Sequence, residues 1–171
     1  MMVGVAAIGA RAQSPGSDAT QQGPPPNPCE TDERHHKLDF WIGNWDVYVN
    51  DTLAGHNVIE SVAGGCALTE SWINVRGIPG VSLNYFDTKD GKYKQLWVAS
   101  GNHTLFVEEH AEPDKLVLIA HSTNAEGVET QTRLTFTKLR ENVRQVFENS
   151  TDGGETWTAG FDGLYVPSHE P

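Results

Sequence analysis

From residue 40 onward, apolar and polar residues alternate with a period of two, and turn-forming residues return about every ten positions. Such alternation places successive side chains on opposite faces of a β-strand. Each apolar run is rich in Val, Ile, Leu, Thr and aromatic residues, and each gap contains Gly, Asn, Asp or Pro. The runs predict ten strands, at residues 40–50, 52–62, 66–75, 80–88, 92–100, 103–110, 115–122, 128–139, 142–150 and 156–166. No stretch of a dozen residues shows helical spacing with a cap at both ends, so the pattern predicts an all-β fold.

The connections between the predicted strands are short, so strands that are neighbours in the sequence should pair antiparallel. A single open sheet of this many strands would curl, and closure removes its exposed edges. We therefore predict a single antiparallel up-and-down barrel of about ten strands, with a two-sheet sandwich as the alternative. The length of 171 residues is that of one domain, which we place at residues 29–168.

The first residues, MMVGVAAIGARA, form a short apolar run that ends in the small-residue pattern found before a signal-peptidase site. We interpret residues 1–12 as the remnant of a signal peptide, which predicts a periplasmic or secreted protein; an Ala-rich start without a targeting role is the alternative. The run is too short to span a bilayer, so membrane insertion is not expected. Residues 13–28 are rich in Pro, Gly, Ser and Gln, which predicts a disordered linker.

The chain has two cysteines, Cys29 at the entrance of the predicted domain and Cys66 within it. In an exported protein an even pair predicts a disulfide. In a reducing compartment both residues would be free thiols. Without C-x-x-C spacing the pair supplies too few ligands for a metal site.

A formal net charge of −11, from 23 acidic residues against 12 Lys and Arg, gives the chain a field that repels phosphate backbones and anionic lipid headgroups. Lys and Arg are scattered along the chain and form no basic cluster. Nucleic acids and membrane surfaces are therefore not expected as partners. No pattern in the sequence specifies an oligomeric state.

The segment STDGGETW, from Ser150 to Trp157, matches the Asp-box motif S-x-D-x-G-x-T-W of sialidase-like propellers. A propeller requires several blades that repeat at roughly 40 to 50 residues, whereas this chain contains one Asp-box and no repeat. We interpret the motif as a device that fixes the turn between the last two strands. Ser150 and Asp152 would bond local backbone, Gly154 would supply a turn conformation, and Trp157 would pack across the hairpin.

Gly43-Asn44-Trp45 matches the G-x-W that opens lipocalin-like barrels, in which the Trp packs at the closed end of the barrel. Further motifs are LDFWIGNWDV (38–47), GCALTESW (65–72), GVSLNYFD (80–87), YKQLWV (93–98) and VRQVFENSTDGGETW with FDGLYV (143–166). Over residues 29–166 these motifs together resemble an uncharacterised bacterial family of lipocalin-like (calycin-type) proteins. The resemblance implies the barrel fold and, since members are often exported, export. It implies no reaction, ligand or catalytic residue.

Alternation also predicts which side chains face the barrel lumen. The inward sets combine aromatic rings with single polar groups, whereas the opposite faces carry charged residues such as Lys92 and Glu148. The predicted lumen residues are Glu70, Trp72, Ser82, Asn84, Phe86, Tyr93, Gln95, Trp97, Gln145 and Phe147. Arg133 has two possible positions, because the Thr-rich run around it shows no polarity contrast: in the lumen as a partner of Glu70, or on the surface.

A lumen of this composition suits a small hydrophobic or amphipathic molecule with a few hydrogen-bonding groups. We therefore predict non-catalytic binding of such a molecule, without a cofactor. One alternative is a structural or interaction module whose core is filled and whose polar residues satisfy one another. Another is a cofactor-free lyase, isomerase or cyclase in which Glu70 acts as acid or base, its pKa raised by burial near Trp72 and Trp97. No G-x-S-x-G, Gly-rich phosphate loop or H-E-x-x-H motif is present.

The histidines suggest no specific chemistry. His35 and His36 lie among acidic residues near the linker, where a solvated entrance segment is expected. His103 and His121 would approach each other across a hairpin. Because no third ligand follows at a predictable spacing, we expect no metal site.

Overall fold

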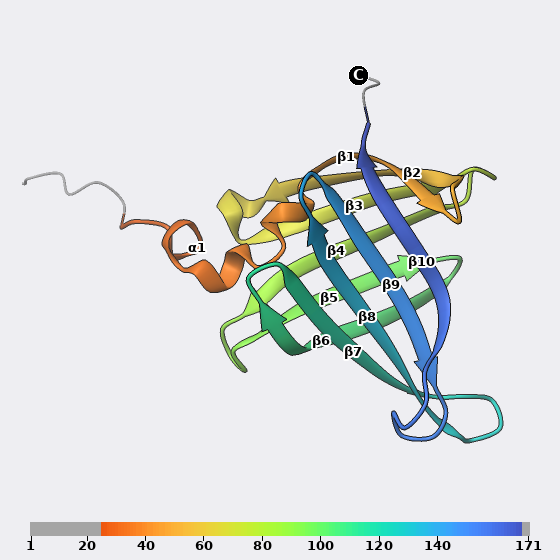
Figure 1. Cartoon of the computed structure of the whole chain (residues 1–171). Helices are drawn as coiled ribbons and strands as arrows, with labels where there is room; N and C mark the ends of the chain where they lie inside the picture. The colour runs from red at the N-terminus through yellow and green to blue at the C-terminus, as the bar shows by residue number, and fades with distance from the viewer. Residues whose placement is uncertain (1–24, 169–171) are drawn as a thin grey trace, which may run out of the picture.

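The structure, a computed structural model, describes residues 25–168; the expected signal-peptide remnant and residues 13–24 of the expected linker lie outside the described residues. Ten antiparallel strands form a closed barrel (Figure 1), which confirms the predicted all-β barrel. The strands are β1 (Gly43–Val49), β2 (Thr52–Val62), β3 (Ala67–Asn74), β4 (Pro79–Asp87), β5 (Lys92–Ala99), β6 (Asn102–Glu112), β7 (Lys115–Thr123), β8 (Glu129–Leu139), β9 (Asn142–Ser150) and β10 (Thr158–Pro167).

Each strand pairs with its neighbours in the sequence, and β1 pairs with both β2 and β10. In the closing pair, Trp45 lies opposite Pro167 and Tyr48 lies opposite Leu164. Because this ladder joins the first strand to the last, the sheet has no free edge. The alternative of a two-sheet sandwich is therefore wrong.

Three short helical turns precede the barrel and lie at one of its ends (Figure 1), which we call the capped end. They are α1 (Pro28–Thr31), η1 (Glu33–His36) and η2 (Asp39–Trp41). The predicted start of the first strand at residue 40 is wrong, because the Trp41 N–H donates to the Leu38 carbonyl oxygen at 2.9 Å and closes a turn there. Leu38 and Trp41 are both 0 % exposed, so this segment fills the capped end.

Aromatic contacts hold the η2 turn in the barrel. The ring of Trp41 packs against Phe136 of β8 at a centroid distance of 4.7 Å and against Tyr165 of β10 at 5.9 Å. Trp45 donates its indole N–H to the Trp41 carbonyl oxygen at 2.8 Å. The Trp of the Gly43-Asn44-Trp45 motif therefore lies at the capped end and contributes to its packing.

A disulfide between Cys29 and Cys66 confirms the predicted pair, with an S–S distance of 1.99 Å. It joins α1 to the start of β3, beside the turn η3 (Ala63–Gly65). The Asn27 amide nitrogen donates to the Gly64 carbonyl oxygen at 2.6 Å and adds a second link. Closing a loop of 37 residues stabilises the folded chain by about 4 kcal/mol in the chain-entropy account.

The Asp-box forms the turn between β9 and β10. Ser150 Oγ donates to Asp152 Oδ1 at 2.7 Å and accepts the Gly154 N–H at 2.9 Å. Asp152 also accepts from the backbone N–H and hydroxyl of Thr156, and these bonds hold the pKa of its carboxyl well below the usual range. Trp157 donates its indole N–H to the Gly154 carbonyl oxygen at 2.9 Å. Since Thr156 belongs to this turn, β10 begins two residues later than predicted.

The core occupies the half of the barrel next to the capped end. Its side chains come from the inward faces of the strands and are nearly inaccessible to solvent. They include Val47, Ile59, Leu68, Phe86, Tyr93, Phe106, Leu116, Leu118, Leu134, Phe136 and Tyr165. Among residues 25–168, no helix has the length and apolar character needed to cross a bilayer.

Candidate ligand-binding cavity

The half of the barrel away from the capped end contains a cavity of about 410 Å³. Side chains from six strands, β1, β2, β3, β5, β9 and β10, line it, and five of the eleven lining residues are aromatic. The lining residues are Val49, Ala54, Glu70, Trp72, Asn74, Gln95, Trp97, Gln145, Phe147, Phe161 and Tyr165. The lumen is therefore filled at one end and hollow at the other.

Glycines on the inward face explain why large aromatic residues leave this space open. A Cβ atom on Gly80 would lie 2.3 Å from Cη2 of Trp97, so the indole ring occupies the position of the missing side chain. A Cβ on Gly163 would likewise lie 2.5 Å from Cε1 of Phe161. These rings pack flat against the wall only because both positions carry no side chain.

Trp72 has the same relation to β2. A Cβ on Gly55 would lie 2.6 Å from Cη2 of Trp72 and 2.3 Å from the Ile73 carbonyl oxygen. At this position a side chain would therefore collide with the neighbouring backbone as well as with the indole. Three of the five aromatic residues that line the cavity are thus held against a glycine.

Glu70 lies at the boundary between the cavity and the filled core. Its side chain is buried, with the residue 4 % exposed, and each carboxyl oxygen accepts one hydrogen bond. Asn57 Nδ2 donates to Oε1 at 2.7 Å, and Ser82 Oγ donates to Oε2 at 2.7 Å. Burial raises the pKa of Glu70 to about 7, although the bonds from Ser82 and Asn57 lower it.

Two arms extend the polar contacts of Glu70 across the lumen. On one side Asn84 Nδ2 donates to Ser82 Oγ at 2.8 Å, and Gln95 Nε2 donates to Asn84 Oδ1 at 2.8 Å. On the other side Asn57 Nδ2 lies 3.4 Å from the Tyr165 hydroxyl. That hydroxyl donates to Gln145 Oε1 at 2.6 Å. A layer of hydrogen-bonded side chains therefore separates the cavity from the core.

Some polar atoms of this layer are unpaired within residues 25–168. Neither Gln95 Oε1 nor Gln145 Nε2 has a hydrogen-bond partner there, and both residues line the cavity. They offer one acceptor and one donor to a molecule in the cavity. Asn57 Oδ1 is buried and also has no partner among the described residues. The layer thus retains hydrogen-bonding capacity.

Six predicted lumen residues line the cavity: Glu70, Trp72, Gln95, Trp97, Gln145 and Phe147. Ser82 and Asn84 lie behind them in the polar layer. Phe86 and Tyr93 also point inward, but they belong to the filled core at the capped end, where Phe86 packs against the ring of His35.

The interior position considered for Arg133 is wrong. On β8 the buried residues are Leu134 and Phe136, so Arg133 faces outward. It forms an ion pair with Glu148 at 2.9 Å, and its guanidinium lies 4.0 Å from the ring centroid of Trp157. Within the described part of the chain, Glu70 therefore has no basic partner in the lumen.

Sequence reasoning missed several residues of the site. Asn57 and Tyr165 belong to the polar layer, and Phe161 belongs to the wall. Phe161, Gly163 and Tyr165 alternate on β10, so period two would have placed them on one face. The remaining lining residues are Val49, Ala54 and Asn74.

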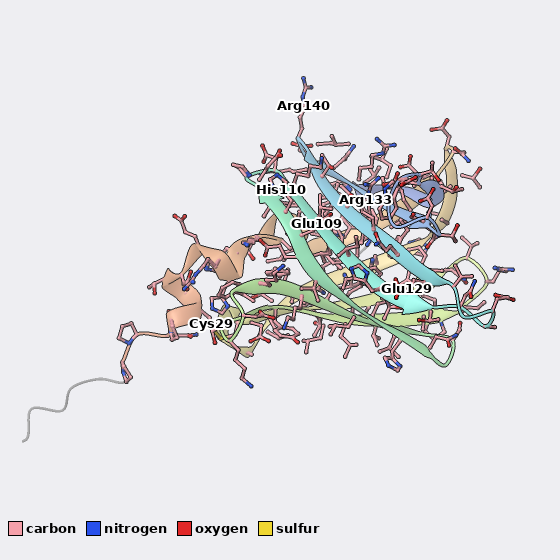
Figure 2. All side chains as sticks on the ribbon, turned by 90° about the horizontal axis from the view of Figure 1, so that it is seen from below. Cys29, Glu109, His110, Glu129, Arg133 and Arg140 are labelled. Carbon is pink, nitrogen blue, oxygen red and sulfur yellow. A yellow bond between two sulfur atoms is a disulfide. The ribbon has the colours of Figure 1, made fainter. Side chains whose placement is uncertain are left out.

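A second hollow, of about 600 Å³, lies on the outer surface over β6 to β9. Glu109, His110 and Arg133 lie on this outer side of the barrel (Figure 2). The hollow is polar, and two of its charged side chains, Arg133 and Glu148, already pair with each other. Arg144 pairs with Asp162. Both arginines of this hollow are thus already paired with carboxylates.

The histidines within residues 25–168 do not form a site. His35 is 8 % exposed and packs on Phe86, so the solvated position expected for it is wrong. The paired register of β6 and β7 runs from Val107 opposite Ile119 to Glu112 opposite Lys115 and includes neither His103 nor His121, and within residues 25–168 no hydrogen bond or ring contact joins these two imidazoles. Within residues 25–168, no group of three or more His, Cys, Asp or Glu side chains is arranged to hold a metal ion.

Comparison of the chain with models of protein families gave no match, and neither did comparison with curated proteins.

Proposed function

We propose that this protein binds a small, mostly apolar molecule in the barrel cavity, without catalysing a reaction. The observation that carries the proposal is the cavity of about 410 Å³ whose aromatic wall is held back by glycines. Ligand pockets commonly measure about 300 to 1,000 Å³ and combine apolar walls with a few convergent polar groups. Glu70, Gln95 and Gln145 are such groups at the base of this cavity.

We further propose that the chain is a lipocalin-like protein that acts in the periplasm or outside the cell. The disulfide between Cys29 and Cys66 supports an oxidising compartment, because such bonds persist there and are rare in the cytosol. The G-x-W motif at Gly43-Asn44-Trp45 and the closed antiparallel barrel support the likeness in fold.

A titration with N-phenyl-1-naphthylamine, a neutral apolar fluorophore, tests the proposal. We expect saturable binding of one probe per chain with energy transfer from the lumen tryptophans. Trp97→Ala should weaken probe binding at least tenfold, since it removes a large aromatic contact. Leu83→Ala, which truncates an exposed apolar residue on the outer face, is the matched control and should leave the affinity unchanged.

Loss of binding in Leu83→Ala together with full binding in Trp97→Ala would place the probe on the outer surface and contradict the proposal. Circular dichroism of both variants establishes that they fold. Absence of saturable binding in the folded wild-type protein would contradict it as well.

A second candidate function, acid–base catalysis by Glu70, is favoured by one observation. A carboxyl with a pKa of about 7 at the base of an apolar cavity can both accept and donate a proton near neutral pH. Native mass spectrometry of wild type and Glu70→Gln from the same cells separates the two functions. An enzyme would retain product in the wild type and substrate in the variant, so two different bound masses would favour catalysis. The same bound mass in both would exclude a lyase, and identical chromatographic retention of the molecules released from the two proteins would exclude an isomerase or a cyclase.

A further inference from the structure

We propose that the molecule bound in the cavity is an organic cation, with an apolar body against the aromatic wall and an ammonium group beside Glu70. This inference rests on the proposed binding function and names the chemical class of its ligand. Three features carry it: the charges that face the cavity, the unoccupied hydrogen-bond acceptor positions of the Glu70 carboxyl, and the aromatic wall.

Only one side chain that lines the cavity carries a charge at neutral or mildly alkaline pH. Among the eleven lining residues, Glu70 and Tyr165 are the titratable ones, and none is Lys, Arg or His. A buried charge requires a partner of opposite sign. A fatty acid or a phosphate ester would bring a second negative charge beside Glu70, with no cationic side chain in the lining to neutralise it. An ammonium group would instead pair with the Glu70 carboxylate.

The Glu70 carboxyl has room for that partner. Its oxygens each accept one hydrogen bond, from Asn57 and from Ser82. A carboxylate offers about four acceptor positions. Because Glu70 lines the cavity, a cation there can lie against this carboxyl and, where it carries N–H groups, can donate to the positions that remain.

The wall suits a cation as well as an apolar body. Trp72, Trp97, Phe147 and Phe161 surround the space, and the last two rings contact each other edge-on at 6.0 Å. The π faces of aromatic rings attract cations, and quaternary ammonium ligands are commonly held in aromatic cages. The formal charge of −11 on the chain also attracts cations and raises their concentration near the protein.

Proton release should accompany binding, because a cation favours the ionised form of Glu70. The groups that face this carboxyl are Asn57 from β2, Ser82 from β4 and Tyr165 from β10. Of these only Tyr165 titrates, and burial together with the Glu70 charge raises its pKa well above 10.0. A ligand with a permanent charge should therefore lose affinity as the pH falls below about 7, where Glu70 becomes protonated.

Two ligands of the same shape test the charge directly. Benzyltrimethylammonium carries a permanent positive charge, and neopentylbenzene replaces its nitrogen with carbon. Both are titrated into the folded full-length protein at pH 8.5 and pH 5.5, with tryptophan fluorescence as the readout. The anion 3-phenylpropanoate forms the third arm, and the experiment is repeated with Glu70→Gln.

At pH 8.5 we expect the cation to bind at least tenfold more tightly than neopentylbenzene and the anion to bind most weakly. The affinity for the cation should fall about tenfold for each pH unit below the pKa of Glu70, whereas the affinity for neopentylbenzene should not change. In Glu70→Gln the preference for the cation and its pH dependence should both disappear while neopentylbenzene still binds.

Equal or tighter binding of neopentylbenzene by the wild type would overturn the inference and leave the proposed binding function intact. A preference for the cation that persists in Glu70→Gln would also overturn it. If none of the three ligands bound, the proposed function would fall together with the inference.

Discussion

The indole of Trp97 lies across Gly80, so closely that a Cβ atom at residue 80 would stand 2.3 Å from ring carbon Cη2. The two residues come from neighbouring strands, and the ring occupies space that any other residue at position 80 would fill. The cavity thus depends on the absence of a side chain at residue 80 as much as on the side chains that line it.

Gly80→Ala should displace the Trp97 ring into the cavity and weaken the binding of N-phenyl-1-naphthylamine at least tenfold. The collision involves side-chain atoms, so the fold should persist with a loss of about 1 to 3 kcal/mol in the free energy of unfolding. Gly160→Ala is the matched control, because residue 160 is exposed and its Cβ would approach no ring, only Asn149 Nδ2 at 3.2 Å and the Phe147 carbonyl oxygen at 3.9 Å. Unchanged probe affinity in a folded Gly80→Ala protein would show that the ring does not shape the binding space.

The proton equilibrium of Glu70 should make stability depend on pH. Its pKa is about 7 in the folded state against 4.5 ordinarily, so between these values the folded state binds more protons than the unfolded state. The stabilisation is complete below about pH 4.5 and is lost as the pH rises through 7, with a magnitude of about 3 kcal/mol.

Urea unfolding of wild type and Glu70→Gln between pH 5 and pH 8 measures this contribution. The difference in free energy of unfolding, wild type minus variant, should decrease as the pH rises. Glu60→Gln, at an exposed position on β2, serves as the control and should give a constant difference. A constant difference for Glu70→Gln too would mean that the folded protein does not perturb this carboxyl.

Removal of the disulfide should lower the free energy of unfolding by about 4 kcal/mol, because the unfolded chain regains the freedom of the loop between Cys29 and Cys66. The double variant Cys29→Ala/Cys66→Ala shows this loss in chemical denaturation. A reducing agent should destabilise the wild type by a similar amount and leave the double variant unchanged. If a reducing agent left the free energy of unfolding of the wild type unchanged, the presence of the disulfide would be contradicted.

Arg133→Ala should leave probe binding unchanged, because Arg133 lies outside the barrel between Glu148 and Trp157. The ion pair is partly exposed, so its loss with that of the cation–π contact should cost about 1 kcal/mol of stability. Fluorescence of Trp157 should change while the probe titration does not. A large loss of probe affinity in Arg133→Ala would instead indicate that Arg133 faces the lumen.

The strands could be predicted from the sequence because period two and the turn residues are local signals. The entry segment at residues 29–40 was compatible with a short helical turn, but its extent to Trp41 was not predicted, since LDFW is as apolar as a strand and only its backbone hydrogen bond reveals the turn. Arg133 had no definite face because TQTRLTFT is polar or Thr-rich on both faces of β8.

The cavity depends on contacts that the local pattern does not contain. Alternation predicted Trp72, Trp97 and Glu70 as inward residues, but the same set could fill a core. What keeps the space open is the pairing of Trp72 and Trp97 with glycines on adjacent strands, Gly55 and Gly80. That pairing follows from register across the sheet, which alternation along a single strand leaves undetermined.

The central claim is that a small molecule occupies the space beside Trp72 and Trp97. ¹⁵N-labelled protein gives one indole N–H signal for each of its five tryptophans, and Trp→Phe variants assign them. On addition of saturating N-phenyl-1-naphthylamine, the signals of Trp72 and Trp97 should shift while those of Trp41, in the capped end, and Trp157, on the outer hairpin, stay in place. Unmoved signals for Trp72 and Trp97, or a shift confined to Trp157, would contradict binding in the lumen.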